Sequence, residues 1–251
     1  MNVSDQNIFL KKLEAALGDV PEALRKKNPS TSDAKNDAGL SLLDRIQQRT
    51  KKKRLELLDR MVAESRDINL NVLPVTDLDA AGRSIQQLAK EKQTEQGTEN
   101  HVVAWQHPLV KSLNLENRFE EISVPVYFPE FSSPEKKTYL REKIVNAFMG
   151  ITSADFCIAD SATMVLKTRP GQPRSTSLAP PIHVAVILLE QVLADLTELY
   201  ALLRNDLTHD SEGVTRCMTF ITGPSKTADI EATMVYGVHG PREVYIYVIT
   251  G

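Results

Sequence analysis

The sequence predicts an α/β fold of three layers, in which a mainly parallel sheet is covered on both faces and is preceded by a helical extension. From residue 67 onward, short apolar stretches of strand length alternate with segments whose apolar side chains recur at helical spacing. Strands that alternate with helices are typical of parallel sheets. The chain has 251 residues, 41% hydrophobic and 25% charged, which is enough to bury a large core.

The first 66 residues form the predicted extension. They carry 14 Lys or Arg against 10 Asp or Glu, whereas the rest of the chain carries 16 against 23. Residues 8–17 and 40–65 show helical stripes of apolar side chains. Residues 21–39 are polar and rich in turn formers, which predicts a mobile linker. We therefore expect an extension at 1–66, with its linker at 21–39, and an α/β domain at 67–251.

A basic run, Arg49 followed by Lys51 to Arg54, interrupts the second stripe. Such a run suits nucleic acid or a membrane surface, and equally a solvated helix face. No aromatic side chains are interleaved with it, which favours the solvated face. The formal net charge of -3 gives the chain no overall positive field, so we expect no nucleic-acid partner.

After residue 67, each expected strand is a short apolar or alternating stretch and each expected helix is amphipathic. The strand at 183–189 is continuously apolar and is expected to be buried. The expected strands are residues 68–72, 101–105, 123–128, 156–159, 164–166, 183–189, 219–222 and 244–249. The expected helices are residues 76–92, 133–148, 190–203 and 226–236.

Cysteine usage excludes several kinds of site. Cys157 and Cys217 are the two cysteines, and both stand in apolar stretches, so we expect small buried thiols and not nucleophiles. Two cysteines exclude a disulfide framework, a CxxC zinc site and a four-cysteine iron–sulfur cluster carried by this chain alone. Walker A, GxGxxG, HExxH and GxSxG motifs are also absent. We therefore expect no metal and no cofactor in this chain.

We also expect no targeting signal. The longest apolar run, residues 184–189, is too short to cross a bilayer, and the first 20 residues lack the apolar stretch of a signal peptide. A cytoplasmic protein without a membrane partner is therefore expected.

The most informative stretch is residues 219–241, TFITGPSKTADIEATMVYGVHGP. An apolar strand runs into Gly223 and Pro224, which lead into the helix expected at 226–236. Unpaired N–H groups at the start of such a helix suit an anion, to which Ser225 or Thr227 would add a hydroxyl and Lys226 a charge. Ser225 is equally suited to capping the helix, and the pattern leaves both interpretations open.

Three more residues of this stretch are candidates. Asp229 and Glu231 follow within the expected helix, but a two-residue offset turns by about 200°, so they are not a paired acid and base. His239 stands in a stiff loop between two glycines and is a candidate acid, base or ligand hydrogen-bonder, or a structural one. We expect 223–227 and His239 to form one site at the carboxyl ends of the strands, where parallel sheets bind ligands.

Two other places concentrate polar residues. Asp160 and Thr163 stand in a tight turn after an apolar strand, where polar side chains often serve function. His183 starts the buried strand, after paired prolines, and suits a core histidine as well as it suits a ligand.

These motifs resemble those of a known family. ITGPSKTADIE at 221–231 and GVHGPRE at 237–243 are similar to the signature of the lactate-utilisation (LUD) domain, and most similar to the lactate-utilisation protein C family. GITSADFCIADSATMVL from Gly150 and SLAPPIHVAVILLEQVLADL from Ser177 match upstream, so that the resemblance covers residues 68–251. One departure is Ala162, which stands where the family usually has a glycine that permits positive φ.

The resemblance implies a three-layer fold like that of glucosamine-phosphate deaminase, ribose-phosphate isomerase and the CoA transferases (NagB/RpiA/CoA transferase-like). It also implies an accessory, non-redox subunit of a cytoplasmic system that oxidises L-lactate to pyruvate with iron–sulfur partner proteins. The electrons would pass through those partners, because this chain has neither cluster cysteines nor a flavin or nicotinamide motif. The candidate residues would then bind a small anion such as lactate or a phosphorylated or CoA-like ligand, with no catalytic residue assigned.

Other functions stay open. A free-standing isomerase or CoA/acyl-transferase-type enzyme, acting on a small phosphorylated or carboxylated metabolite, needs a base or nucleophile, and Glu231 or Asp160 would serve only if oriented inward. Alternatively, the motifs stiffen the fold and the N-terminal helices recruit partners. Whether the chain is itself an enzyme is not decided by its sequence.

Overall fold

The computed structural model describes residues 37–92, 99–129, 134–205, 217–228 and 234–251. The chain divides into two compact units, Met1–Leu40 and Ser41–Gly251, and the described residues belong almost entirely to the second. The helix expected at 8–17 lies outside the described residues. The linker expected at 21–39 also lies outside them, except for its last three residues, which begin helix α2 (Asp37–Gln47).

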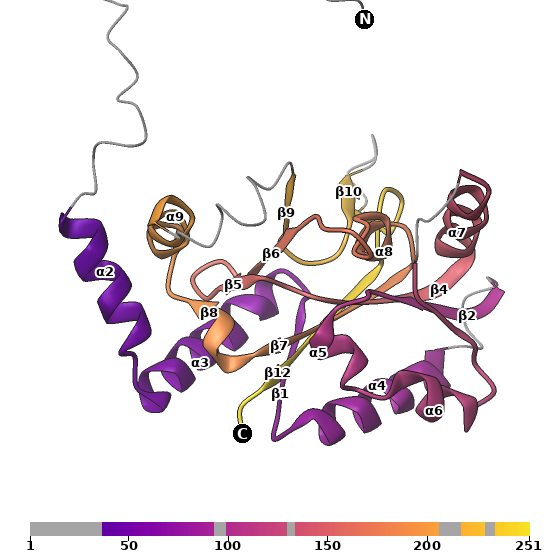
Figure 1. Cartoon of the computed structure of the whole chain (residues 1–251), viewed down its shortest axis with the longest axis horizontal. Coiled ribbons are helices and arrows are strands. Elements are labelled where there is room, and N and C mark those ends of the chain that lie inside the picture. Colours follow the sequence, from indigo (N-terminus) through magenta and orange to yellow (C-terminus); the bar gives the residue numbers. More distant parts are fainter. Residues whose placement is uncertain (1–36, 93–98, 130–133, 206–216, 229–233) are drawn as a thin grey trace, which may run out of the picture. The chain divides into compact units, whose positions relative to one another are not determined.

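Six strands of the described residues form one sheet in which every neighbouring pair is parallel. Its order is β1-β12-β7-β4-β2-β3 (Figure 1). The strands are β1 Asn71–Val75, β2 Glu99–Ala104, β3 Val126–Tyr127, β4 Ala147–Ser153, β7 Ile182–Leu188 and β12 Glu243–Ile249. Strands β4 and β7 are almost entirely buried, as strands covered on both faces must be. The mainly parallel sheet that the sequence predicts is confirmed.

Helices cover one face of this sheet. Helix α4 (Leu78–Lys92) packs Ala81, Ile85 and Ala89 into a core that it shares with α5 (Pro108–Lys111) and α6 (Leu115–Glu120). Figure 1 shows these three helices together below the sheet. Helix α7 (Pro134–Asn146) contacts β2 and β4, and its Ile144 packs against Val103 of β2.

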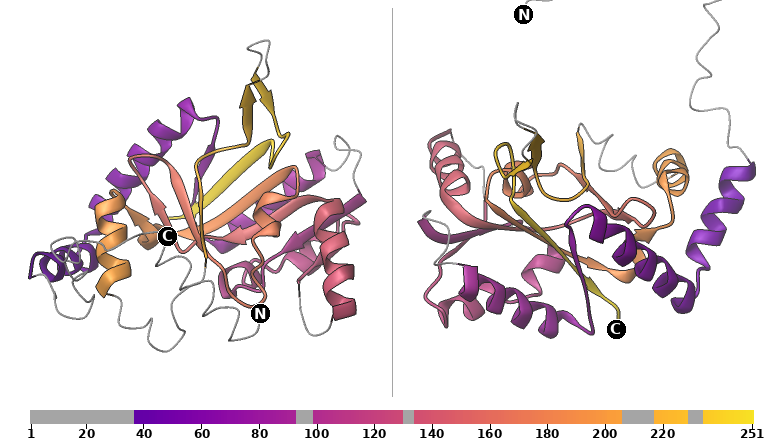
Figure 2. Two further views of the ribbon diagram at one scale, coloured as in Figure 1. Left: turned by 90° about the horizontal axis from the view of Figure 1, so that it is seen from above. Right: turned by 180° about the vertical axis from the view of Figure 1, so that it is seen from behind.

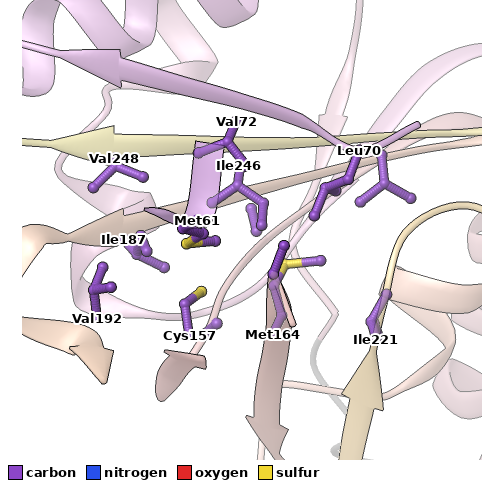
Figure 3. Close-up of a cluster of buried hydrophobic side chains, with 14 of the residues drawn as sticks. Met61, Leu70, Val72, Cys157, Met164, Ile187, Val192, Ile221, Ile246 and Val248 are labelled. Atoms are coloured by element: carbon purple, nitrogen blue, oxygen red, sulfur yellow. The ribbon is translucent and has the colours of Figure 1, made fainter. Parts of the chain in front are cut away.

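The opposite face is covered by a second, smaller sheet and by helices. The smaller sheet has the order β8-β5-β6-β9, and its strands are β8 Val192–Leu193, β5 Phe156–Ile158, β6 Thr163–Lys167 and β9 Met218–Ile221. Helix α8 (Ser175–Leu178) lies over β4 and β7, and helix α9 (Leu196–Asn205) packs on the smaller sheet. Figure 3 shows the core between the two sheets, where Cys157 and Met164 face Ile187 and Ile246.

Helix α3 (Lys51–Asp67) belongs to this core. Thr50 caps its N-terminus, since the Thr50 side chain accepts the N–H of Lys53, and the helix buries Leu58 and Met61 with residues of β1 and β12. The compact unit begins at Ser41, so it includes α3, which the boundary expected at residues 66/67 assigns to the extension.

Part of the basic run has structural contacts. Arg49 forms an ion pair with Glu198 of α9, and both side chains are largely buried. The Arg54 guanidinium donates to the carbonyl oxygen of Glu190 at 3.2 Å, whereas Lys51 to Lys53 are exposed. The run is therefore divided between holding α3 against its neighbours and facing solvent.

One expected helix begins later than predicted, and one is wrong. Residues 190–203 form the end of a 3-10 turn (Leu189–Gln191), strand β8 and most of α9. In place of the helix at 226–236, strands β10 (Lys226–Ala228) and β11 (Met234–Tyr236) pair antiparallel (Figure 2, left view, top). Thr227, Val235 and Tyr236 are β-branched or aromatic, and such residues fit a strand pair better than a helix once a partner strand is available.

The first expected strand begins later than its alternating pattern predicts. Ile68 is the C-cap of α3, and Asn69 has the left-handed φ of 58°, so β1 begins at Asn71. Asparagine tolerates this backbone region, which lets the chain reverse from helix to strand within three residues.

Candidate functional site

The turn at Gly223 to Thr227 leads into a strand, not into a helix. Strand β9 ends at Ile221 and β10 begins at Lys226, so Ser225 has no helix to cap. Both interpretations of this turn, as a helix N-terminus that binds an anion and as a helix cap, are therefore wrong.

This turn lies at the amino-terminal edge of the main sheet. Gly223 has φ 80°, and a Cβ there would lie 2.9 Å from the carbonyl oxygen of Ile68, just before β1. The backbone N–H groups of Arg242 and Glu243 donate to the carbonyl oxygen of Pro181, just before β7. The expected position at the carboxyl ends of the strands is wrong, because the helical crossover that would place the turn there does not form.

The β10–β11 hairpin nevertheless brings the turn beside the loop that carries His239. The N–H of Ser225 donates to the carbonyl oxygen of Pro241 at 2.8 Å, and the N–H of Gly237 donates to that of Ser225 at 3.0 Å. His239 is exposed within this loop. The two segments adjoin because they are the two ends of one hairpin.

The turn that carries Asp160 and Thr163 contacts the same region. Thr163 is buried, and its hydroxyl lies 2.7 Å from that of Thr222 and 2.9 Å from that of Ser161. Asp160 is half-buried. The Thr163 side chain thus contacts Thr222, the residue before Gly223.

Ala162, the departure from the family pattern, adopts the left-handed φ of 47° with its methyl group fully buried in the core. A glycine would adopt this backbone without strain, and alanine costs about 1–2 kcal/mol there before the burial of its methyl group offsets part of it.

A cleft of about 540 Å³ lies next to these segments. It is formed by the turn between α3 and β1, by the hairpin and by the start of β12. Its lining residues are Arg66, Asn69, Leu70, Asn71, Pro224, Tyr236, Arg242 and Glu243. We call this cleft the arginine cleft, after Arg66 and Arg242. Of the candidate site residues that the sequence predicts, Pro224 alone is among its described lining residues.

Two asparagines hold the walls of the arginine cleft together. The Asn69 side-chain amide donates to the Tyr236 hydroxyl at 2.9 Å, which joins the α3–β1 turn to the hairpin. The Asn71 amide donates to the carbonyl oxygen of Val244 at 3.2 Å, which joins β1 to β12. Segments that are far apart in the sequence thereby form one surface.

The arginine cleft carries positive charge. Arg66 and Arg242 are exposed, and neither forms an ion pair with a carboxylate of the described residues. The Lys226 ammonium lies 5.9 Å from the ring centroid of Tyr236, at the same place in the hairpin.

The one carboxylate among the lining residues, that of Glu243, is already bound. It pairs with Lys92 at 3.1 Å and accepts the hydroxyl of Tyr245. Burial and this hydrogen bond raise the pKa of Tyr245 above its usual range, so the phenol stays a neutral donor. Glu243 therefore cancels little of the arginine charge, and the arrangement suits an anion.

Gly237 positions Arg242. It has φ 81°, and a Cβ there would overlap the Arg242 side chain at Cγ. We expect Gly237→Ala to lower the free energy of unfolding by about 1–2 kcal/mol, the cost of a left-handed alanine, and to displace Arg242.

Urea denaturation measures this loss. Gly240→Ala is the matched control, because Gly240 lies in the same loop without a positive φ and a Cβ there would meet its nearest neighbour, Ser225, at 3.3 Å. Equal losses in the two variants would contradict the role assigned to Gly237.

His183 is a core histidine. Its side chain is fully buried, its Nε2 lies 2.8 Å from the Thr152 hydroxyl, and its Nδ1 has no partner among the described residues. Burial lowers the pKa of His183 to about 3, so the imidazole is neutral. Cys157 is likewise buried, and burial raises the pKa of its thiol, which agrees with an unreactive cysteine.

Asp229 and Glu231 lie outside the described residues, so their expected roles stay predictions. Within the described part of the chain, no group of three or more His, Cys, Asp or Glu side chains is arranged to hold a metal ion. Nor does any described helix combine the length and apolar composition needed to cross a membrane.

Sequence reasoning missed most of the cleft-lining residues. Arg66 stands at the end of the extension, Asn69 stands in the first expected strand, and Tyr236 stands in the wrongly expected helix. One signal was available, because Arg242 and Glu243 are the last two residues of the GVHGPRE motif at 237–243. The others become recognisable only when the hairpin and the α3–β1 turn are seen together.

Comparison with known proteins points to one family. The model of the LUD domain matches residues 58–249. A protein named lactate utilization protein C from Halalkalibacterium halodurans is 34% identical over 155 residues, which are 61% of this chain and 65% of that protein. Proteins of the same name are 28% identical in Geobacillus sp., over 78% of each chain, and 40% identical in Exiguobacterium sp., over 45% of this chain and 47% of that one.

These matches therefore span from about half to about three quarters of the length of the curated relatives. Among solved structures, a DUF162 family protein from Deinococcus radiodurans is similar with a TM-score of 0.49 and 18% identity, over 80% of this chain and 99% of that one.

Proposed function

The chain belongs to the LUD domain family, and from this membership we propose that it takes part in lactate utilisation. In this proposal it is an accessory, non-redox subunit of a cytoplasmic system in which iron–sulfur partner proteins oxidise L-lactate to pyruvate. Relatives named lactate utilization protein C support the role. The electrons pass through the partners, because two isolated cysteines provide no cluster ligands.

The arginine cleft is the observation that carries the binding part of the proposal. It adjoins the turn at 223–225 and the loop at 237–241, and it presents the guanidinium groups of Arg66 and Arg242. Guanidinium groups bind carboxylate and phosphate through paired hydrogen bonds, so the cleft is proposed to bind a small anionic ligand. The contribution of this chain is to bind and orient that ligand.

Growth on L-lactate tests the role. A strain that lacks this gene is expected to lose growth on L-lactate as sole carbon source while it still grows on pyruvate, and the wild-type gene is expected to restore it. Unimpaired growth of the deletion strain on L-lactate would contradict the proposal.

Variants connect this role to the cleft. We expect the double variant Arg66→Gln, Arg242→Gln to fold normally and to fail to restore growth, because it removes the two guanidinium groups that line the cleft. Arg83→Gln, on helix α4, removes an exposed arginine paired with Asp79 and is expected to restore growth fully. Growth restored equally by both variants would remove the cleft from the proposed function.

A further inference from the structure

We propose that the ligand of the arginine cleft is a phosphate ester with a planar ring, such as a nucleoside diphosphate, and not L-lactate itself. The proposal rests on the proposed function in one respect, namely that this cleft is the anion site. Its support comes from the size, the charge and the aromatic wall of the cleft.

The size of the cleft favours a ligand larger than lactate. Its volume of about 540 Å³ falls within the range of roughly 300–1,000 Å³ that is usual for sites of cofactor-sized ligands. L-lactate is much smaller than such ligands and would leave most of the lining residues without a contact.

The charge of the cleft favours more than one negative group. Two cationic side chains from separate segments line it, Arg66 from the end of α3 and Arg242 from the loop before β12. The Lys226 ammonium of β10 lies beside the cleft, 5.9 Å from the centroid of the Tyr236 ring. The Glu243 carboxylate is already paired with Lys92. A single carboxylate would leave cationic charge uncompensated, whereas a diphosphate matches it, and arginine binds phosphate oxygens in a bidentate manner.

The wall of the cleft includes an aromatic ring that is held in place. The Tyr236 side chain is 40% exposed, and its hydroxyl accepts the Asn69 amide at 2.9 Å, which fixes the ring against the α3–β1 turn. A base stacks on such a ring without specific hydrogen bonds. The combination of a fixed aromatic surface with adjacent cations is what a nucleotide requires.

Binding of defined probes to the full chain tests this inference. At constant ionic strength, calorimetry is expected to show ADP as the tightest probe, inorganic pyrophosphate about tenfold weaker, and L-lactate at least about a hundredfold weaker than ADP. Pyrophosphate is expected to be weaker than ADP because it has no base to stack on the ring. L-lactate is expected to be weaker still because it also lacks a second charged group.

Variants separate the two contributions. Arg242→Gln is expected to weaken ADP and pyrophosphate alike, by about tenfold. Tyr236→Ala is expected to weaken ADP by about tenfold and to leave pyrophosphate within threefold, while Tyr236→Phe, which keeps the ring, retains most of the ADP affinity. Arg83→Gln, outside the cleft, is the control for general loss of positive charge and is expected to change neither affinity.

The failures are distinguishable. If L-lactate binds as tightly as ADP and loses its affinity in Arg242→Gln, this inference is overturned and the anion site of the proposed function stands. If ADP binds but neither Arg242→Gln nor Tyr236→Ala weakens it, the ligand lies elsewhere and the inference is overturned. If no probe binds, both the inference and the anion site fail, while growth on L-lactate still reports on the role in lactate utilisation.

Discussion

Replacing Gly150 with alanine is expected to lower the free energy of unfolding by about 3 kcal/mol or more. Gly150 is buried in the middle of β4, and a Cβ there would overlap the backbone carbonyl oxygen of Thr176 and lie 3.1 Å from Cγ of Pro180. Because Thr176 belongs to α8, which packs on β4 and β7, the overlap cannot be relieved by a side-chain rotation. Either α8 or the centre of the sheet must shift.

Gly82→Ala is the matched control for this effect. Gly82 is also buried, but the three atoms nearest to a Cβ there all belong to the Arg118 side chain and none to the backbone. Its place inside α4 adds a gain in helix propensity of up to about 1 kcal/mol, so we expect a change of less than about 1 kcal/mol. Urea denaturation of both variants is the measurement. A Gly150→Ala protein as stable as Gly82→Ala would show that α8 does not press on β4.

Acidification from pH 7 to pH 4 is expected to cost about 3 kcal/mol of stability through His183 alone. Burial lowers the pKa of His183 from 6.5 to about 3 in the folded protein. Between these two pH values the unfolded chain takes up a proton that the folded chain does not, so stability falls as the pH falls. Above pH 6.5 the full contribution of His183 to the free energy of unfolding is present. Below pH 3 the folded chain takes up the proton too, so stability falls no further through this group.

His183→Gln isolates this contribution. Glutamine has no titrating group in this range, and its amide can take the place of Nε2 beside the Thr152 hydroxyl. Between pH 6 and pH 4, the free energy of unfolding of the variant is expected to depend less steeply on pH than that of the wild type. The difference in slope is about 1.4 kcal/mol per pH unit, the value for one proton. Denaturation curves at a series of pH values give both slopes, and parallel slopes would contradict a neutral buried imidazole.

The candidate site was predictable in part. The motif residues Gly223 and Pro224 and the loop of His239 do adjoin, and the left-handed φ values of Gly223 and Gly237 explain why glycine stands at both places. Their position at the amino-terminal edge of the sheet was not predictable, because it depends on how β9 and β12 are ordered in space. Arg66 and Asn69 reach the site only through the α3–β1 turn.

The sequence by itself determined the parallel core. The expected strands at 183–189 and 244–249 are mainly apolar, which predicts strands covered on both faces, and the stripe of α4 has one apolar face to bury. Isolated cysteines in apolar stretches likewise determined that this chain carries no four-cysteine cluster of its own.

Tertiary structure alone decided the rest. Whether residues 226–236 form a helix or a hairpin depends on the pairing of Lys226 with Tyr236, a contact that local periodicity does not encode. The packing of a second sheet over one face of the first, and the convergence of Arg66 and Arg242 on one cleft, depend on contacts between segments that are far apart in the sequence. Local propensities determine which segments form helices and strands. Which of these elements lie side by side, and therefore where the site forms, follows from burial and hydrogen bonding that exist only in the folded chain.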